Sequence, residues 1–456
     1  MLDTIHGWVN SFNSVGGVIQ IFVLLPVGIF LTLRFGFIQF RKFGHAIDVV
    51  RGKYDNPNDP GDISHFKALT TALSATVGVG NIAGVALAVK IGGPGAVFWM
   101  WVTAAFGMAT KFAECSLGLK YRKILDDGSA CGGPMYYIEA AFGKISPALG
   151  KFVGGFFAIA FVFLAMNIGN LIQANTAAET LSASYGLPPI AVGLVLAALL
   201  FGVIIGGVKR IGDVTARLVP AMAILYVGFA LIIILLNFSQ IIPCFVRIFT
   251  DAFTGTAATG GFVGSTFIIA ARMGIARGLF SNEAGMGSAP IAHSAAKTTE
   301  AISQGVVATL EPFIDTICIC TMTALVILMT GVWQTSDLQG AALTVAGFTT
   351  GLPSGFAALA THVVNIGILL FAFSTIISWS YYGERALVYR FGTKSILPYR
   401  IIQCGVTVVG SVFALEFVWA LGDFFIFFTT IPNLVAILIM VGLLHKETQA
   451  YFKKYT

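Results

Sequence analysis

Two glycine-rich stretches, each inside a long apolar run, hold the backbone groups best suited to bind a ligand. They are residues 74–81 (SATVGVGN) and residues 277–285 (RGLFSNEAG), about 200 positions apart. A helix that unwinds in hydrocarbon frees N–H and C=O groups, so a break survives there only around a ligand or a cavity. Free N–H groups at a helix N-terminus suit a carboxylate, and free carbonyls suit a cation or an ammonium group. A zwitterionic amino acid bound beside a metal cation fits both kinds of group.

Side chains in two other apolar runs could complete such a site. Ser374 and Thr375 are adjacent hydroxyls, and hard cations prefer oxygen ligands. Asn170 and Gln173 are three residues apart, so they share a helix face with each other. The alternatives remain open: the hydroxyls could bond to their own helix, and the amides of Asn167, Asn170 and Gln173 could simply join helices.

The amino-acid composition indicates that these candidate ligand groups lie within a membrane. Hydrophobic residues make up 57% of the 456 residues and charged residues 11%, whereas soluble domains carry about 25% charged residues. We therefore expect lipid to be the main solvent, which excludes a soluble enzyme and a nucleic-acid binder. The six cysteines show no paired spacing, so neither a disulfide framework nor a zinc site is expected.

The runs are long enough for helices that cross a bilayer, and the fold class predicted is an all-α membrane protein. We expect about eleven spans, at residues 15–36, 68–90, 96–119, 152–180, 189–208, 216–238, 262–296, 304–331, 356–384, 398–416 and 421–444. The interrupted spans 2 and 7 each begin a set of five. Interruptions at matching positions are typical of inverted repeats, with the binding site between them. For a single such motif, close helix packing around glycine would be the simpler reading; two at matched positions favour binding.

The predicted organisation is one added helix followed by two five-span repeats. The boundaries we expect are 1–60 for the first helix and its loop, 61–240 and 241–445 for the repeats, and 446–456 for the tail. On this arrangement 22 of the 27 Lys and Arg residues fall on one side of the membrane and two on the other. Cytoplasmic segments are the basic ones, so the N-terminus is predicted outside and the C-terminus in the cytoplasm.

Charged residues within the predicted spans are costly and therefore functional candidates. They are Lys111, Glu114, Arg272, Arg277, Glu283, Glu311 and Asp315. Lys111 and Glu114 are spaced to pair on one helix face. Glu311 and Asp315 also share a face, and we expect an arginine to neutralise them, although a proton or a cation could do so. For His293 we expect a plain polar role rather than a proton relay.

Three segments resemble the alanine/glycine:cation symporter family. They are residues 92–107 (GGPGAVFWMWVTAAFG), 274–293 (GIARGLFSNEAGMGSAPIAH) and 311–315 (EPFID). The resemblance implies a LeuT-type fold of two inverted repeats with two broken helices. It also implies sodium-coupled uptake of alanine or glycine, with sodium as a transported co-substrate, in the cell membrane and without an organic cofactor.

The wider likeness to LeuT-type transporters implies roles for individual residues. The N–H groups of Val79 and Gly80, next to Gly78, would hold the substrate carboxylate, and the Thr76 carbonyl would help bind the amino group. The sodium ligands implied are the carbonyls of Ser74, Val77 and Phe371 and the hydroxyls of Ser374 and Thr375. Asn81 matches a second sodium position found in some relatives. The remaining pocket residues implied are Asn170, Gln173, Gly278, Phe280, Ser281 and Asn282.

Three alternatives stay open at this stage. A proton could replace sodium; some proton-coupled relatives carry a lysine in the span that here covers 216–238, which has none. A membrane enzyme would need catalytic pairs that are not recognisable, so we expect no enzyme. A passive channel would also tolerate broken helices. The preference for alanine or glycine, the sodium stoichiometry and the oligomeric state are left open.

Overall fold

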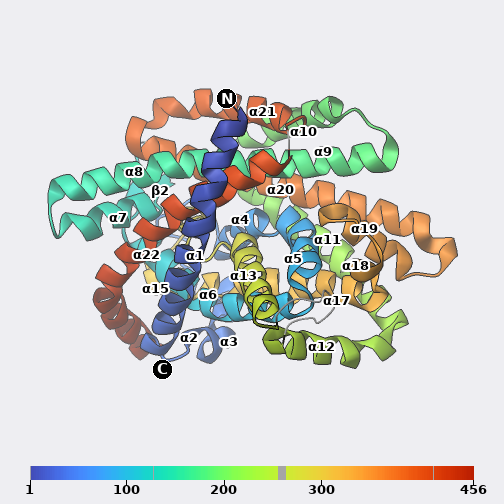
Figure 1. Ribbon diagram of the computed structural model, residues 1–456. Helices are drawn as coiled ribbons and strands as arrows, with labels where there is room; N and C mark the ends of the chain where they lie inside the picture. The colour runs from blue at the N-terminus through green and yellow to red at the C-terminus, as the bar shows by residue number, and fades with distance from the viewer. Residues whose placement is uncertain (1, 127, 255–262, 414, 456) are drawn as a thin grey trace.

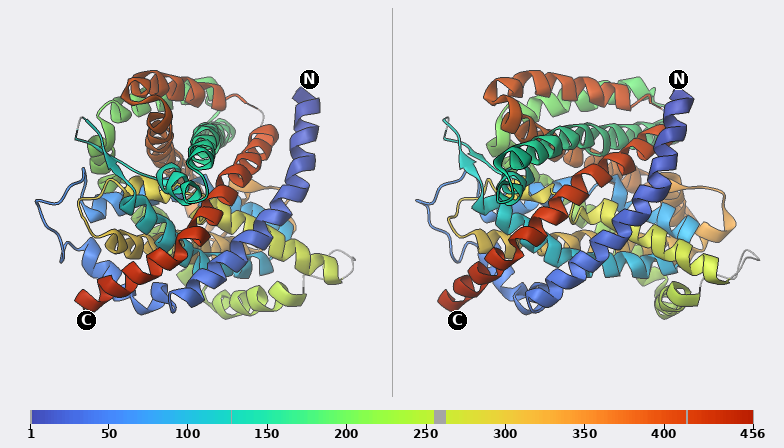
Figure 2. Two further views of the ribbon diagram at one scale, coloured as in Figure 1. Left: turned by 90° about the vertical axis from the view of Figure 1, so that its left-hand side faces the viewer. Right: turned by 60° about the vertical axis from the view of Figure 1, so that its left-hand side comes forward.

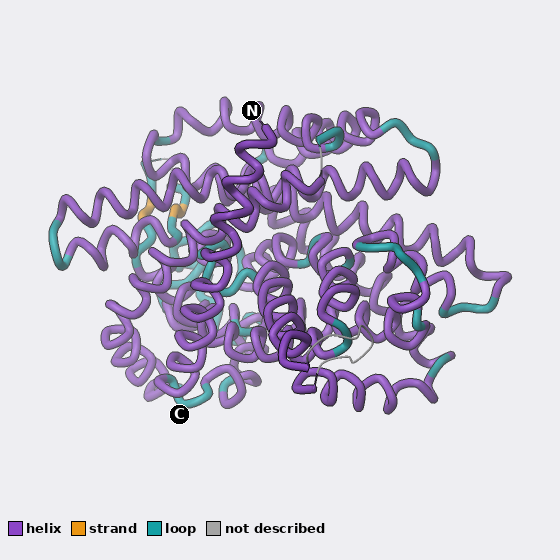
Figure 3. Tube along the Cα trace, viewed as in Figure 1, coloured by secondary structure: helices purple, strands orange, loops and turns teal. Residues whose placement is uncertain are grey.

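The computed structural model describes residues 2–126, 128–254, 263–413 and 415–455, and these residues are almost entirely helical (Figure 3). The only sheet among them is an antiparallel pair of two-residue strands, β1 (Lys123–Ile124) and β2 (Ala130–Cys131). The prediction of an all-α membrane protein is confirmed.

Each predicted span coincides with helical structure. The first six correspond to α1 (Leu2–Arg34), α4 with α5 (His65–Thr76 and Ala83–Gly92), α6 (Gly95–Lys120), α8 with α9 (Pro147–Met166 and Ile172–Tyr185), α10 (Pro189–Ile204) and α11 (Gly207–Leu236). The others correspond to α13 with α14 (Val263–Asn282 and Ala289–His293), α15 to α17 (Ala301–Ala308, Leu310–Pro312 and Thr321–Thr330), α20 (Ala357–Phe391), α21 (Ile396–Gly410) and α22 (Leu415–Lys454).

By length and composition alone, seven described helices could cross a membrane, and the bent pair α4 and α5 makes eight. Helix α10 is apolar but shorter, α21 has 15 residues, and α13 with α14 forms the second interrupted span. The count of eleven therefore includes three segments that are shorter or interrupted.

Several short helices between the spans were not predicted. They are α2 (Ile38–Arg41), α3 (Phe43–Val50), α7 (Pro134–Gly143), α12 (Ile241–Thr254), α18 (Val332–Thr335) and α19 (Gly340–Thr350). In α12, Cys244, Ile248 and Ala252 are buried at four-residue intervals. A stripe of this kind marks a helix that lies against the protein with one face, and such a helix has no continuous apolar run to reveal it.

The first predicted break is present. Helix α4 ends at Thr76, a single 3-10 turn follows at Val79–Asn81, and α5 leaves at an angle of 58° to α4. The second break begins within the predicted stretch 277–285, near its end. Helix α13 continues to Asn282, and the chain then turns through Glu283, Gly285 and Gly287 with φ of 56°, 89° and 83°. Gly278, Phe280 and Ser281 are thus helical, and the helical conformation ends at Asn282.

Two further irregularities occur in helices predicted as continuous. A π-helical turn at Asn167–Leu171 joins α8 to α9, and another at Phe313–Cys320 joins α16 to α17. Such π turns are rare and are frequent at functional sites. Both here lie next to residues of the first break, as described below.

Around this centre, α1 packs along α6 and α22 outside the remaining helices (Figure 1). The N- and C-termini lie at opposite ends of the molecule in each view (Figure 2).

Candidate functional site

Oxygen atoms from α4 and α20 converge where α4 ends. The Ser374 and Thr375 hydroxyls lie 3.4 and 3.1 Å from the Ser74 carbonyl oxygen. The Ser374 hydroxyl also lies 2.9 Å from the carbonyl of Phe371, and the hydroxyl of Ser74 donates to the Ser374 carbonyl at 2.7 Å. All four residues are buried. Four of the five predicted sodium ligands are therefore brought together, as an uncharged set of oxygen donors.

The fifth, Val77, is buried three residues after Ser74, and its N–H donates to Leu73 at 2.7 Å. Within the described residues, its carbonyl makes no hydrogen bond with the hydroxyls of Ser374 or Thr375. The neighbouring Gly78 approaches Thr375 so closely that a Cβ there would lie 2.5 Å from the threonine hydroxyl. The backbone of the break thus lies directly against the cluster of oxygens.

The N–H groups of the break have different partners. The Gly78 N–H bonds to the Asn81 side-chain oxygen at 2.9 Å, and the Val79 N–H donates to the Gln173 side-chain oxygen at 3.1 Å. The Gly80 N–H has no hydrogen-bond partner among the described residues. Gln173 is itself fixed by a bond from its amide nitrogen to the Ile168 carbonyl, within the first π turn. An amide oxygen therefore lies where the sequence predicts a carboxylate.

A small cavity of about 10 Å³, room for about one water molecule, lies beside the break. Its lining is Ala75, Thr76, Gly78, Gly80, Ile168, Gln173, Phe280, Glu283 and Trp379. A Cβ on Gly80 would lie 3.0 Å from the Phe280 ring. In this conformation an amino acid has no room in the cavity unless a lining side chain such as Phe280 moves.

Glu283 is the acidic side chain of this cavity, and the sequence indicated it only as one of several intramembrane charges. Its carboxylate accepts bonds from Trp379 Nε1 at 3.1 Å and from the Ser288 hydroxyl at 2.5 Å. Its left-handed backbone conformation, rare for a residue other than glycine, turns the chain out of α13. No sequence pattern marks that conformation for a glutamate.

Asp315, in the second π turn, links the two broken helices. It accepts a bond from Asn81 Nδ2 at 2.6 Å and bonds from the hydroxyls of Ser281 and Thr316, each at 2.7 Å. The expected arginine partner is absent: among the described residues, Asp315 has no Lys, Arg or His within 4 Å. A carboxylate with no exposed surface and only neutral donors is an evident place for a cation or a proton.

Several predicted pocket residues lie outside the cavity. Asn81 and Ser281 point to Asp315, and Asn282 donates to the Thr316 hydroxyl at 3.3 Å. Gly278 packs against α6 near Met100. Asn170 bonds to the Gln403 side chain at 2.5 Å, and Asn167 bonds to the Val418 carbonyl at 3.1 Å. These two asparagines join helices, which was the alternative stated for them.

The other intramembrane charges also pair differently from expectation. Lys111 bonds to Glu311 at 3.1 Å on another helix, and Glu114 instead accepts a bond from Asn433 at 2.9 Å. Arg277 lies 3.5 Å from Asp423, while Arg272 is exposed. The expected pairing of Lys111 with Glu114 and of an arginine with Glu311 or Asp315 is wrong, because partners on neighbouring helices are nearer.

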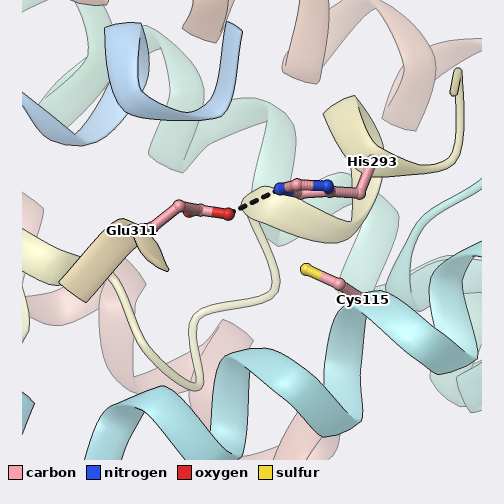
Figure 4. Close-up of side chains that lie close together, drawn as sticks. All are labelled: Cys115, His293 and Glu311. Atoms are coloured by element: carbon pink, nitrogen blue, oxygen red, sulfur yellow. Dashed lines mark hydrogen bonds and ion pairs between the residues drawn. The ribbon is translucent and has the colours of Figure 1, made fainter. Parts of the chain in front are cut away.

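Glu311 receives His293 as well as Lys111. The His293 Nε2 lies 2.6 Å from Glu311 Oε1, and the Cys115 thiol lies beside them (Figure 4). The ligand atoms of these three residues lie within 4.8 Å of one another, a spacing that a metal ion could use. However, the other Glu311 oxygen is already neutralised by the Lys111 ammonium, so the set is better described as an internal ion pair.

Aromatic rings separate the small cavity from a wider one. Phe280 lines the small cavity, and its ring centroid lies 4.8 Å from that of Trp419. Trp419 in turn lines a cavity of about 500 Å³ between α5, α9 and α19. The Arg277 guanidinium lies 5.7 Å and 5.0 Å from the two ring centroids. These residues close the small cavity on one side of the molecule.

Two broken helices that meet at a small cavity with an oxygen cluster beside it are the arrangement of a LeuT-type fold. Solved structures agree with this fold: the crystal structure of MhsT in complex with L-phenylalanine matches with a TM-score of 0.59 at 14% identity, over 84% of this chain and 90% of that one.

The chain belongs to the sodium:alanine symporter family, whose model matches residues 2–456. It is 45% identical to the sodium/alanine symporter AgcS of Methanococcus maripaludis, over 97% of this chain and 96% of that protein. It is 36% identical to the probable sodium/glutamine symporter GlnT of Bacillus subtilis, over 96% of this chain and 87% of that protein. The protein is therefore a multi-pass membrane transporter of a sodium-coupled family, not an enzyme.

Proposed function

We propose that this protein is a symporter that carries small neutral amino acids, alanine and glycine, into the cell together with sodium by alternating access. The observation that carries the proposal is the convergence of Ser74, Phe371, Ser374 and Thr375 oxygens at the break in the first interrupted span. Sodium bound there, with Val77 as a further ligand, would hold α4 against α20 and so fix the backbone that lines the cavity.

The amino acid would bind across the break. Its carboxylate would accept the free Gly80 N–H and the Val79 N–H, displacing the Gln173 oxygen. Its ammonium group would bind near the Thr76 carbonyl and the Glu283 carboxylate, which both line the cavity. Charged groups make hydrogen bonds about twice as strong as neutral ones, which favours this exchange.

The contact of Phe280 with the first break supports alanine and glycine over larger substrates. Phe280 lies against Gly80, and its ring is held by Trp419 and Arg277. Similar proteins carry names that specify alanine or glutamine, so the family alone does not decide the size of the substrate. The contact between Phe280 and Gly80 favours the smaller one.

Asp315 supports a second candidate, in which a proton or a second sodium ion also couples transport. One similar protein, from Bacillus subtilis, is named a putative sodium/proton-dependent alanine carrier. The Asp315 carboxylate accepts bonds from Asn81, Ser281 and Thr316, and no cationic side chain in the described part of the protein forms an ion pair with it. If Asp315 binds a proton during transport, the alternative of proton-coupled transport would depend on this one residue.

The test is uptake of radiolabelled alanine into proteoliposomes with an inward gradient of sodium or of potassium. Concentrative uptake with sodium alone supports symport, and uptake driven equally well by external acid in potassium supports the proton alternative. The paired substitution Ser374→Ala and Thr375→Ala should raise the sodium concentration for half-maximal uptake by at least about tenfold, since it removes two ligands. The control is Thr361→Ala on the same helix, because the Thr361 hydroxyl bonds only to its own helix.

A further inference from the structure

A second group of polar side chains, separate from the cavity, forms a continuous chain of contacts. It runs from Lys111 to Glu311 at 3.1 Å, and from Glu311 to His293 Nε2 at 2.6 Å. His293 Nδ1 lies 2.6 Å from the Gln304 oxygen, and the Gln304 nitrogen bonds to His65 Nδ1. His65 Nε2 lies 3.2 Å from Asp55, the outermost residue of the chain.

This hydrogen-bond chain joins elements that are distant in sequence. His65 is the first residue of α4, and His293 is the last residue of α14, so each lies at the end of one arm of an interrupted span. Gln304 and Glu311 lie on α15 and α16, and Lys111 on α6. Apart from Asp55, whose side chain is 43% exposed, every member is nearly or fully buried. The hydrogen-bond chain therefore connects helix α4 to the rest of the protein at the face that carries Asp55.

The donors and acceptors allow only some protonation states. Gln304 has one oxygen and one NH₂ group, so it can accept a bond from one histidine N–H and donate to one bare histidine nitrogen. With its oxygen toward His293, both His293 nitrogens must carry hydrogen and His65 Nδ1 must not. Rotating the amide by a half turn, which exchanges its oxygen and nitrogen, reverses these requirements and places the second hydrogen on His65 Nδ1.

This constraint determines which histidine of the hydrogen-bond chain carries the positive charge. In the first arrangement His293 is the cation, paired with Glu311; in the second, His65 is the cation, paired with Asp55. Two protonated histidines cannot both be satisfied, because two N–H groups would then face one amide that offers a single oxygen. One of the links through Gln304 must break, and the link to His65 at the outer end is the one next to solvent.

Other charges near the two histidines act unequally. Near His293 and Glu311 lie Lys111, Glu114, Cys115, Glu283 and Tyr382. Near His65 lie Asp55 and Asp59, in addition to His293 itself. The inner histidine thus has the fixed Lys111–Glu311 pair beside it, and the outer one has the carboxylates of Asp55 and Asp59 beside it.

We propose that Asp55, His65, Gln304, His293 and Glu311 form a proton-binding latch that holds one exchangeable proton and releases the arm α4 when a second proton binds. The proposed topology places Asp55 in the cytoplasm, so internal acid would open the latch and favour the inward-open state. This regulatory proton is distinct from any ion that is transported, because the chain does not include the residues of the cavity or Asp315.

Hydrogen–deuterium exchange of the purified full-length protein in sodium tests the latch without requiring transport. After correction for intrinsic rates, the amides of residues 65–76 should lose protection at least about fivefold between about pH 8 and pH 5.5, the range in which histidine titrates. His65→Gln removes the titrating group and should reduce this change to less than about twofold. His362→Gln, at an exposed histidine bonded to Tyr185, is the control and should behave as the wild type.

A second variant covers the case in which His65→Gln does not fold. Gln304→Met keeps the length of the side chain but removes the amide, so residues 65–76 should exchange rapidly already at pH 8, with α22 unchanged. Protection of residues 65–76 that is independent of pH in the wild type would overturn the proposal. So would an unchanged pH dependence in His65→Gln, or full protection at pH 8 in Gln304→Met.

Discussion

At the scale of single residues, glycine and phenylalanine set the size of the site. Gly80 leaves room for a ligand only because it has no Cβ, and Phe280 is held in place by Trp419 and Arg277. The break was predictable from its glycines. The contact between Gly80 and Phe280 was not, because nothing in the sequence specifies which face of α13 meets the first break.

Replacing Gly80 by alanine should therefore impair transport of the larger substrate most. Overpacking of this kind costs about 1–3 kcal/mol, which lowers kcat/KM for alanine by about tenfold and that for glycine by less. The control is Gly84→Ala, since nothing lies within 4 Å of a Cβ at Gly84. Competition assays in proteoliposomes measure the ratio, and an equal loss for both substrates would show that Gly80 does not limit size.

Asp315 gives a second prediction at this scale. Asp315→Asn keeps a side chain of the same shape but removes the negative charge. Its amide oxygen can still accept the bond from Asn81, and its NH₂ group can donate to the Ser281 hydroxyl oxygen. If a second cation binds there, the Hill coefficient for sodium should fall, or the dependence on external pH should disappear, while the protein still folds. A variant with wild-type sodium and pH dependence would leave Asp315 a structural residue.

At the scale of elements, apolar runs predicted the spans, and glycines predicted the first break. The sequence did not reveal the π turns at Asn167–Leu171 and Phe313–Cys320, because a π turn changes the register of a helix without changing its composition. The pairing of Lys111 was missed for a related reason. Spacing along one helix predicts neighbours on that helix, whereas the burial of Glu311 on another helix decided the actual partner.

The second break depends on glycines with positive φ. Gly287 has a φ of 83°, and a Cβ there would lie 2.5 Å from Pro134. Gly287→Ala should lower the free energy of unfolding by about 2–5 kcal/mol, from the backbone conformation and from overpacking. The melting temperature in detergent measures this loss. Gly442→Ala, inside α22 with open space around it, should leave the melting temperature unchanged or raise it.

At the scale of the whole molecule, the distribution of basic residues along the sequence predicts a cytoplasmic C-terminus. All six cysteines are buried or half-buried, so a single introduced cysteine can report its side of the membrane against little background. In whole cells, Ser354→Cys should react with a membrane-impermeant thiol reagent, and Lys446→Cys only after permeabilisation. The reverse labelling pattern would invert the proposed topology and move the latch to the outer face.

The hydrogen bond from the Val79 N–H to Gln173 affects how the measured affinity for the substrate is interpreted. The binding site is already filled by a group of its own, so substrate arrival is a replacement and the measured constant is a difference between two occupants. Gln173→Leu removes this internal competitor, so the variant would bind the substrate more tightly and release it more slowly. The rate of transport then depends on the Gln173 side chain, which competes with the bound amino acid and helps to release it on the inner side.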